Sequence, residues 1–233
     1  MREPISRDAR LALDLALTIR HDGNGGVTDD LTDPAGLTAW VRAHPELLPG
    51  TATDRADDHR EGSAAGTAPR SSDAGGGFTA DADQLTAVRE LRAAVRALFA
   101  RAVRPGAPSP ADAARLMPPE DAVRHLNEAA ARTPTVPVLD WPEGAGPRIL
   151  RTPVRTAGDP AAALAHAVIA FLASPDSDRL RACHAPRCVR YFLKEHPRQE
   201  WCKPSCGNRA RVARHHQRHK GDGVDPAGTV RVA

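Results

Sequence analysis

All four cysteines of the 233-residue chain lie in one segment near its C-terminus. It reads Cys183-His184-Ala185-Pro186-Arg187-Cys188, then thirteen residues, then Cys202-Lys203-Pro204-Ser205-Cys206-Gly207-Asn208-Arg209. Two close cysteine pairs separated by a short excursion are the ligand pattern of a tetrahedral zinc site. Zinc displaces the thiol protons, so metal binding and folding of such a segment are one event. The predicted ligands of one structural Zn²⁺ are Cys183, Cys188, Cys202 and Cys206.

Other uses of four cysteines fit this pattern less well. Two disulfides require an oxidising compartment, and nothing upstream resembles a secretory signal. A redox pair would need a C-x-x-C motif within a βαβ pattern, which the sequence lacks. Catalytic zinc keeps an open coordination position, and four thiolates leave none. His184 and His196 could each replace a thiolate, but we interpret both as surface residues because the cysteines complete the site.

Charge is distributed unevenly along the chain. Residues 181–220 carry eleven Lys/Arg and two glutamates, a net charge of +9, whereas the other residues carry 21 basic and 27 acidic side chains. The overall charge of +3 therefore combines an acidic body with a cationic module. Four thiolates and one Zn²⁺ subtract two charges, which leaves this module near +7. A compact polycation indicates a polyanionic partner, nucleic acid first, although a solvated basic surface that binds nothing is the alternative.

The residues after Cys206 are predicted to form a helix with one cationic face. Arg211, Arg214, His215 and Arg218 recur at helical spacing. The candidate nucleic-acid contacts are Asn208, Arg209, Arg211, Arg214 and Arg218. Arg209 could instead brace the module through a carbonyl or a carboxylate. His215 and His219 lie four residues apart and could hold a second metal, but a basic face needs no metal to form.

At these residues the sequence resembles a known family. Cys206-Gly207-Asn208-Arg209 matches the motif of the CGNR zinc finger, and Trp201-Cys202 and the basic segment after the motif also fit. In that family the finger is a C-terminal module thought to bind DNA, attached to an N-terminal ABATE domain, in proteins thought to regulate transcription under stress. Leu13-Asp14-Leu15, followed by Thr18, resembles the opening helix of the ABATE domain.

The remaining sequence predicts a mainly α fold. Helical patterns are expected over residues 5–21, from Pro34 to the residue before Pro45, from 81 to 104, and after Asp159-Pro160. Residues 137–154 read as two short strands around Glu143-Gly144-Ala145-Gly146. Asp29, Asp30 and Asp33 are interpreted as solvated or capping carboxylates. Tyr191, Phe192 and Trp201 are expected to pack beside the zinc, because so small a module cannot build an ordinary core.

The expected organisation has three parts. Residues 1–173 form an ABATE-like helical domain with a small β-hairpin, which folds without the finger, and its Gly-, Ala- and Ser-rich residues 50–77 form a disordered insertion. Residues 174–220 form the four-cysteine zinc finger ending in the basic helix. Residues 221–233 are a frayed tail. No apolar run is long enough to span a membrane, and a cytoplasmic, bacterial protein is expected.

The sequence contains no convincing catalytic constellation, so an enzyme is not expected. We expect a DNA-binding transcription regulator whose N-terminal domain senses a ligand or dimerises. An RNA-binding protein and a protein-interaction adaptor that uses the same finger are the alternatives, since charge alone does not separate them. A homodimer and an unknown small-molecule effector are candidate partners.

Overall fold

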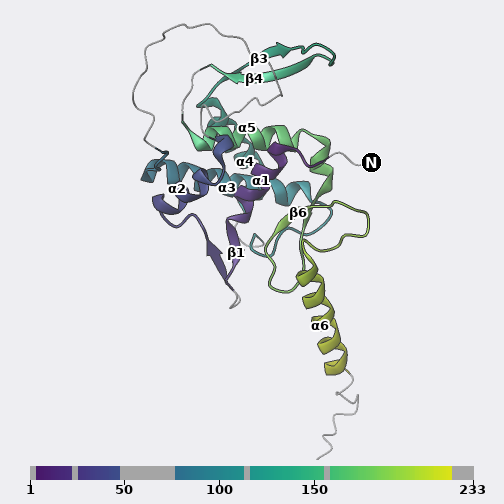
Figure 1. Cartoon of the computed structure of the whole chain (residues 1–233). Coiled ribbons are helices and arrows are strands. Elements are labelled where there is room, and N and C mark those ends of the chain that lie inside the picture. Colours follow the sequence, from purple (N-terminus) through teal and green to yellow (C-terminus); the bar gives the residue numbers. More distant parts are fainter. Residues whose placement is uncertain (1–3, 23–25, 48–76, 113–115, 155–157, 222–233) are drawn as a thin grey trace, which may run out of the picture. The chain divides into compact units, whose positions relative to one another are not determined.

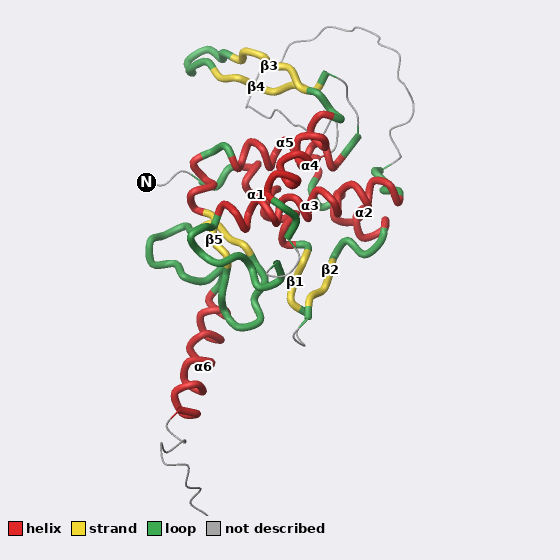
Figure 2. The backbone as a smooth tube through the Cα atoms, turned by 180° about the vertical axis from the view of Figure 1, so that it is seen from behind, coloured by secondary structure: helices red, strands yellow, loops and turns green. Residues whose placement is uncertain are grey.

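The computed structural model describes residues 4–22, 26–47, 77–112, 116–154 and 158–221. The fold of these residues is mainly α, as predicted, with three two-stranded antiparallel pairings (Figure 1, Figure 2). The α-helices are α1 (Arg7–Leu17), α2 (Pro34–Arg42), α3 (Ala82–Ala102), α4 (Pro119–Ala131), α5 (Pro160–Leu172) and α6 (Pro204–Gly221). The short 3₁₀ turns are η1 (Pro45–Leu47) and η2 (Pro175–Arg179). The strands are β1 (Ile19–His21), β2 (Val27–Asp29), β3 (Thr135–Asp140), β4 (Arg148–Pro153), β5 (Leu180–Ala182) and β6 (Tyr191–Leu193).

Helix α1 is shorter than the 5–21 expected from periodicity. Ser6 caps its start by accepting a hydrogen bond from the amide of Ala9, and its buried face carries Ala, Leu, Ala, Leu and Ala. The helix ends at Leu17, where the Thr18 hydroxyl donates to the carbonyl of Leu15. The residues that follow form β1, which pairs with β2. The last residues of the predicted helix, Ile19–His21, therefore form a strand and not a last helical turn.

The chain divides into two compact units. Unit 1 comprises residues 1–30, 92–126 and 167–233, and unit 2 comprises residues 31–91 and 127–166. The core of unit 1 includes three rings that pack edge to face: the Phe99 centroid lies 5.7 Å from that of Phe171 and 5.4 Å from that of Tyr191. Such pairs are favourable beyond the burial of their surface. Phe99, Phe171 and Tyr191 come from α3, α5 and β6, so the finger contributes to this core.

Unit 2 contains α2 and the β3–β4 hairpin. Asp33 and Pro34 start α2 as predicted, because the Asp33 carboxylate accepts a hydrogen bond of 2.7 Å from the amide of Gly36. Arg89 donates to the carbonyls of Leu31 and Thr32, which fixes the segment before α2. The hairpin pairs in register from Thr135 with Pro153 to Asp140 with Arg148.

Two sequence predictions fall largely outside the described residues. The insertion expected at 50–77 lies outside them except for Gly77, and the tail expected at 221–233 lies outside them except for Gly221. The boundary expected between 173 and 174 lies inside unit 1, which joins residues 167–233 to the N-terminal helix and to part of α3. Independent folding of the body stays a prediction.

Candidate metal centre and nucleic-acid interface

Strand β5 leads directly into the first cysteine pair. The amide of Cys183 donates to the carbonyl of Arg190 at 2.9 Å, and the amide of Cys188 donates to the carbonyl of Ala185 at 2.9 Å. Arg187, just before the second cysteine, has a φ of 61° in the left-handed region. A non-glycine residue with this φ is uncommon, and here it closes the turn that aims both thiols at one point.

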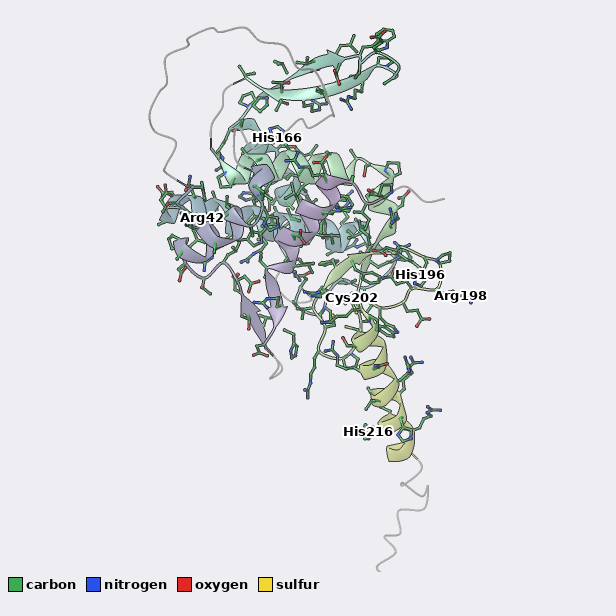
Figure 3. All side chains as sticks on the ribbon, in the orientation of Figure 1. Arg42, His166, His196, Arg198, Cys202 and His216 are labelled. Atoms are coloured by element: carbon green, nitrogen blue, oxygen red, sulfur yellow. The ribbon has the colours of Figure 1, made fainter. Side chains whose placement is uncertain are left out.

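The second pair returns after the excursion. Strand β6 pairs with β5 in the register Leu180 with Leu193, so the excursion folds back onto the strand that precedes Cys183. Cys202 lies beside the N-terminal end of α6, and His196 and Arg198 lie on the loop before it (Figure 3). Cys206 sits in the first turn of α6, where its amide donates to the carbonyl of Lys203 at 3.0 Å. The last thiol is therefore fixed to a helix terminus.

The four sulfur atoms meet at one place. All lie within 4.8 Å of one another, with Sγ–Sγ distances of 3.7 Å for Cys188 and Cys202 and 3.5 Å for Cys202 and Cys206. A Zn–S bond of about 2.3 Å in tetrahedral geometry requires sulfur separations of about 3.8 Å. None of the four is in a disulfide, and His184 and His196 are exposed and outside the group. The predicted ligand set therefore fits one structural Zn²⁺.

The electrostatics of the thiols also favour a cation. Hydrogen bonds from Cys188 and Cys202 lower the pKa of Cys183, and backbone amides of Cys202 and Ala185 add to this. Hydrogen bonding to Cys183 raises the pKa of Cys188 to about 11, and hydrogen bonds to Cys183 and Cys188 raise that of Cys202 further. One thiolate is thus stabilised at the expense of its neighbours. A divalent cation at the centre removes this conflict because it stabilises all four thiolates together.

The apolar packing around the metal centre differs from the prediction in one residue. Phe192 and Trp201 pack against the cysteine cluster with Ala185, as expected. Tyr191 does not: its ring joins Phe99 and its hydroxyl is held by Asp112. Adjacent residues of a strand point to opposite faces, so Tyr191 and Phe192 serve different cores.

Gly207 is required for a close approach and not for a turn. It lies inside α6, and a Cβ there would come within 3.0 Å of Cδ1 of Trp201. The missing side chain lets the indole ring lie against the first turn of α6.

Arg209 contacts the metal centre itself. Its Nη2 donates to Sγ of Cys206 at 3.1 Å. The guanidinium therefore offsets part of the negative charge that four thiolates leave on a bound zinc, as outer groups around metal ligands commonly do. The bracing role was expected through a carbonyl or a carboxylate; the structure gives it through a thiolate sulfur.

The other candidate contacts lie along α6. Arg211, Val212, Arg214, His215 and Arg218 line one face of the helix, and Asn208 is exposed near its start. Val212 is 56% exposed on this cationic face, which the charge pattern alone did not single out. The side chain of His219 lies outside the described residues, so the pair with His215 stays a prediction.

The clustered aspartates were interpreted as solvated or capping: Asp33 caps α2 as interpreted, whereas Asp29 and Asp30 form ion pairs instead. Asp29 accepts two hydrogen bonds from Arg92, of 2.5 and 2.6 Å, and Asp30 pairs with Arg20. Arg92 also donates to the buried hydroxyl of Thr18. Asp29 therefore fixes the hairpin to α3 through a charge-assisted pair.

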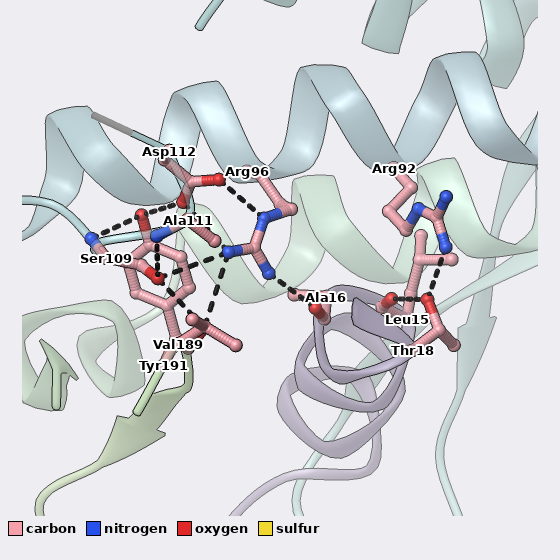
Figure 4. A network of polar contacts seen from close by, with 10 residues as sticks. All are labelled: Leu15, Ala16, Thr18, Arg92, Arg96, Ser109, Ala111, Asp112, Val189 and Tyr191. Atoms are coloured by element: carbon pink, nitrogen blue, oxygen red, sulfur yellow. Dashed lines mark hydrogen bonds and ion pairs between the residues drawn. The ribbon is translucent and has the colours of Figure 1, made fainter. Parts of the chain in front are cut away.

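A second, buried polar network joins α3 to the finger (Figure 4). Arg96 donates to both oxygens of Asp112, to the carbonyl of Ala16 and to the carbonyl of Val189. Ser109 donates through its hydroxyl to the same Val189 carbonyl at 2.8 Å. Arg96 and Asp112 are 2% and 6% exposed, so this ion pair is desolvated and depends on full hydrogen bonding. Sequence reasoning missed it because the partners are far apart in the chain.

The fold and the metal centre define a helical protein with a C-terminal four-cysteine zinc finger. The family model of the CGNR zinc finger matches residues 179–219, and that of ABATE, described as a "putative stress-induced transcription regulator", matches residues 9–175. The chain therefore belongs to the ABATE family and carries a CGNR zinc finger. No curated protein matches the chain. In the described residues, no helix is both long and apolar enough to cross a membrane.

Proposed function

We propose that this protein is a transcription regulator that binds DNA through α6. The observation that carries the proposal is the exposed row of Arg211, Arg214 and Arg218 on a helix whose first turn holds Cys206. A helix anchored by a metal ligand has a fixed origin and direction, so its cations are presented rigidly. Rigid cations on one face suit contact with the regularly spaced phosphates of a duplex.

The start of α6 supplies the residue for base recognition. Asn208 is exposed near the N-terminal end of α6, close to the metal centre. The N-terminal residues of a recognition helix are the ones that contact base edges in the major groove. An asparagine can bond both N6 and N7 of an adenine in the major groove. Arg209 contributes to this surface indirectly, since its guanidinium bonds to Cys206 and thereby holds the helix terminus.

The test is the salt dependence of duplex binding by the zinc-loaded chain, measured by fluorescence anisotropy. Arg214→Ala and Arg218→Ala should weaken binding to every sequence and lower the salt slope by about one unit each. Asn208→Ala should cost about 1–3 kcal/mol on a selected site and little on other sequences. Arg101→Ala removes an exposed cation from α3 and serves as the control. An Arg214/Arg218 double variant that binds like the parent at every salt concentration would sink the proposal.

The same titration with RNA distinguishes an RNA-binding protein from a DNA-binding one. A-form RNA has a deep, narrow major groove that a helix cannot enter, so α6 should prefer duplex DNA. Tighter binding to single-stranded RNA than to duplex DNA of the same sequence would make RNA the partner.

Val212 favours one further candidate, a protein-interaction adaptor. An exposed apolar side chain within a basic face can contact an apolar patch of an acidic protein, as well as the methyl group of a thymine. Val212→Asn should then abolish partner binding while the Arg214/Arg218 variant keeps it. For a DNA reader the order is reversed, because phosphate contacts supply most of the affinity.

Dimerisation of the N-terminal domain is part of the proposal. The β3–β4 hairpin exposes Leu139, Trp141 and Ile149 by 66%, 67% and 71%. Exposed apolar patches of this kind mark interaction surfaces. A Leu139→Asp/Ile149→Asp variant should sediment as a monomer if a second copy covers this surface. A parent chain that sediments as a monomer at high concentration would remove dimerisation from the proposal.

A further inference from the structure

Unit 1 contains a cleft of about 320 Å³. Of the residues predicted to contact nucleic acid, Arg209 alone lines it. Its lining comes from segments far apart in the sequence: the end of β1, residues 187–190, and Lys203 and Arg209 around the start of α6. Cys188 and Val189 line it too, and both are buried. The polar lining residues are Arg20, His21, Arg187, Arg190, Lys203 and Arg209.

The cleft concentrates positive charge. Among its five Lys/Arg side chains, Arg20 pairs with Asp30 and Arg209 bonds to the Cys206 sulfur. In the part of the chain that the structure describes, no acidic side chain pairs with Arg187, Arg190 or Lys203. Like charges gathered in a concave site repel one another and focus a positive potential into it. The arrangement is therefore favourable when an anion occupies the cleft.

The backbone that carries these cations is fixed. Arg187 has left-handed backbone torsion angles in the turn between the first two cysteines. The carbonyl of Arg190 accepts a hydrogen bond from the amide of Cys183. The carbonyl of Val189, between them, accepts from Ser109 and from Arg96. Lys203 immediately follows a metal ligand. The cations thus start from positions held by zinc and by the buried network, which lowers the entropy lost when they close on a ligand.

We propose that this cleft is a phosphate-binding site. Each guanidinium group can donate two parallel hydrogen bonds to phosphate oxygens, and the ammonium group of Lys203 adds a positive point charge. The phosphate has two sources: the backbone of bound DNA, or a soluble phosphate or pyrophosphate group of a small effector. Only the first source depends on the proposed function. Arg20 lies in the ABATE domain, so the site brings a residue of that domain to the ligand of the finger.

Two measurements on the full, zinc-loaded chain test the site. Isothermal titration with inorganic pyrophosphate follows the soluble source, and the salt slope of duplex binding follows the DNA source. The cleft variant is Arg187→Ala/Arg190→Ala. The matched control is Lys194→Ala/Arg198→Ala, which removes two cations from the excursion outside the cleft. Zinc content is measured for each, since Arg187 and Arg190 flank a ligand.

A tenfold or greater loss of pyrophosphate affinity in the cleft variant alone supports a soluble ligand. A salt slope that falls by about two units in the cleft variant alone supports a DNA phosphate. Equal behaviour of the cleft variant and the control in both measurements overturns the site. If the cleft variant loses zinc, Lys203→Glu replaces it, with Glu200→Lys as a charge-changing control outside the cleft. The Arg214/Arg218 result is separate, so failure of the cleft and failure of the proposed function are distinguished.

Discussion

Tyr191 donates a hydrogen bond of 2.6 Å to the carboxylate of Asp112 across a sequence separation of 79 residues. The same tyrosine oxygen accepts from the amide of Ser109 at 3.3 Å. Because Asp112 also pairs with Arg96, this bond links β6 of the finger to α3. The finger and the rest of unit 1 therefore share buried polar contacts as well as an aromatic core.

Removing the Tyr191 hydroxyl should destabilise the whole of unit 1. Tyr191→Phe keeps the ring but leaves the amide of Ser109 without its partner, and it removes one of the two hydrogen bonds that Oδ2 of Asp112 accepts. A buried polar group that loses its hydrogen bond lowers the free energy of unfolding by about 1–3 kcal/mol. The urea concentration at the midpoint of unfolding should therefore fall. Thr152→Val, which removes an exposed hydroxyl from β4, should change stability by less than about 0.5 kcal/mol. Equal midpoints for Tyr191→Phe and the parent would contradict the assigned network.

The contribution of Tyr191 should depend on alkaline pH. Burial, then the hydrogen bond to Asp112 and its charge, raise the pKa of Tyr191 above its ordinary value of 10.0. A raised pKa means that the stabilisation is complete below about pH 10 and is lost as pH rises further, because the unfolded chain releases the proton first. The stability gap between the parent and Tyr191→Phe should therefore narrow between about pH 9 and pH 11. A gap that stays constant over this range would show that the hydroxyl is not held neutral by the fold.

Truncation measures how far the body depends on the finger. A chain ending at Leu180 loses Tyr191 and Leu193, which are 1% and 4% exposed in the intact protein. We expect the truncated chain to stay helical and to unfold cooperatively, at a lower temperature than the zinc-loaded full chain. Thermal unfolding followed by circular dichroism gives the difference. Loss of the cooperative transition would show that the finger and the body form one core.

Each chain should bind one zinc ion through the four cysteines. Cys202→Ser should release the zinc, because one ligand of a closed tetrahedral site is lost, and Ser205→Ala, next to Cys206, should retain it. Chelation of the parent should reduce helicity, since the first turn of α6 is fixed through Cys206. Metal analysis of purified protein checks the stoichiometry. Zinc well below one equivalent under reducing conditions would refute the site.

Arg209 should tune zinc affinity through the Cys206 sulfur. Arg209→Ala removes a charge-assisted hydrogen bond to a ligand, and losses of this kind typically cost about 10–100-fold in metal affinity. Competition with a chromophoric chelator measures the change. Arg211→Ala is the matched control, because that side chain lies on the exposed face of the same helix. Unchanged zinc affinity together with lost binding to one preferred DNA site would make Arg209 a base-reading residue.

Particular elements show where sequence reasoning stopped. The spacing of the four cysteines was enough to predict that they meet at one site. Two close cysteine pairs that do not form disulfides have few uses other than binding a metal. The first helix was predicted too long, because its apolar periodicity continues to Ile19, whereas pairing with β2 makes Ile19–His21 a strand. Tyr191 was predicted to pack beside the zinc because so small a finger was not expected to share a core with the body, whereas its ring packs against Phe99.

The sequence by itself determined the metal ligands, the mainly α class and the cationic character of residues 181–220, because these follow from residue types at short spacings. Tertiary structure alone decided that Tyr191 joins the body and that Arg20 meets Arg187 and Lys203 at one cleft. Local patterns encode which residues share an element. Contacts between residues tens to more than a hundred positions apart depend on how the elements close on one another, and no local period records that.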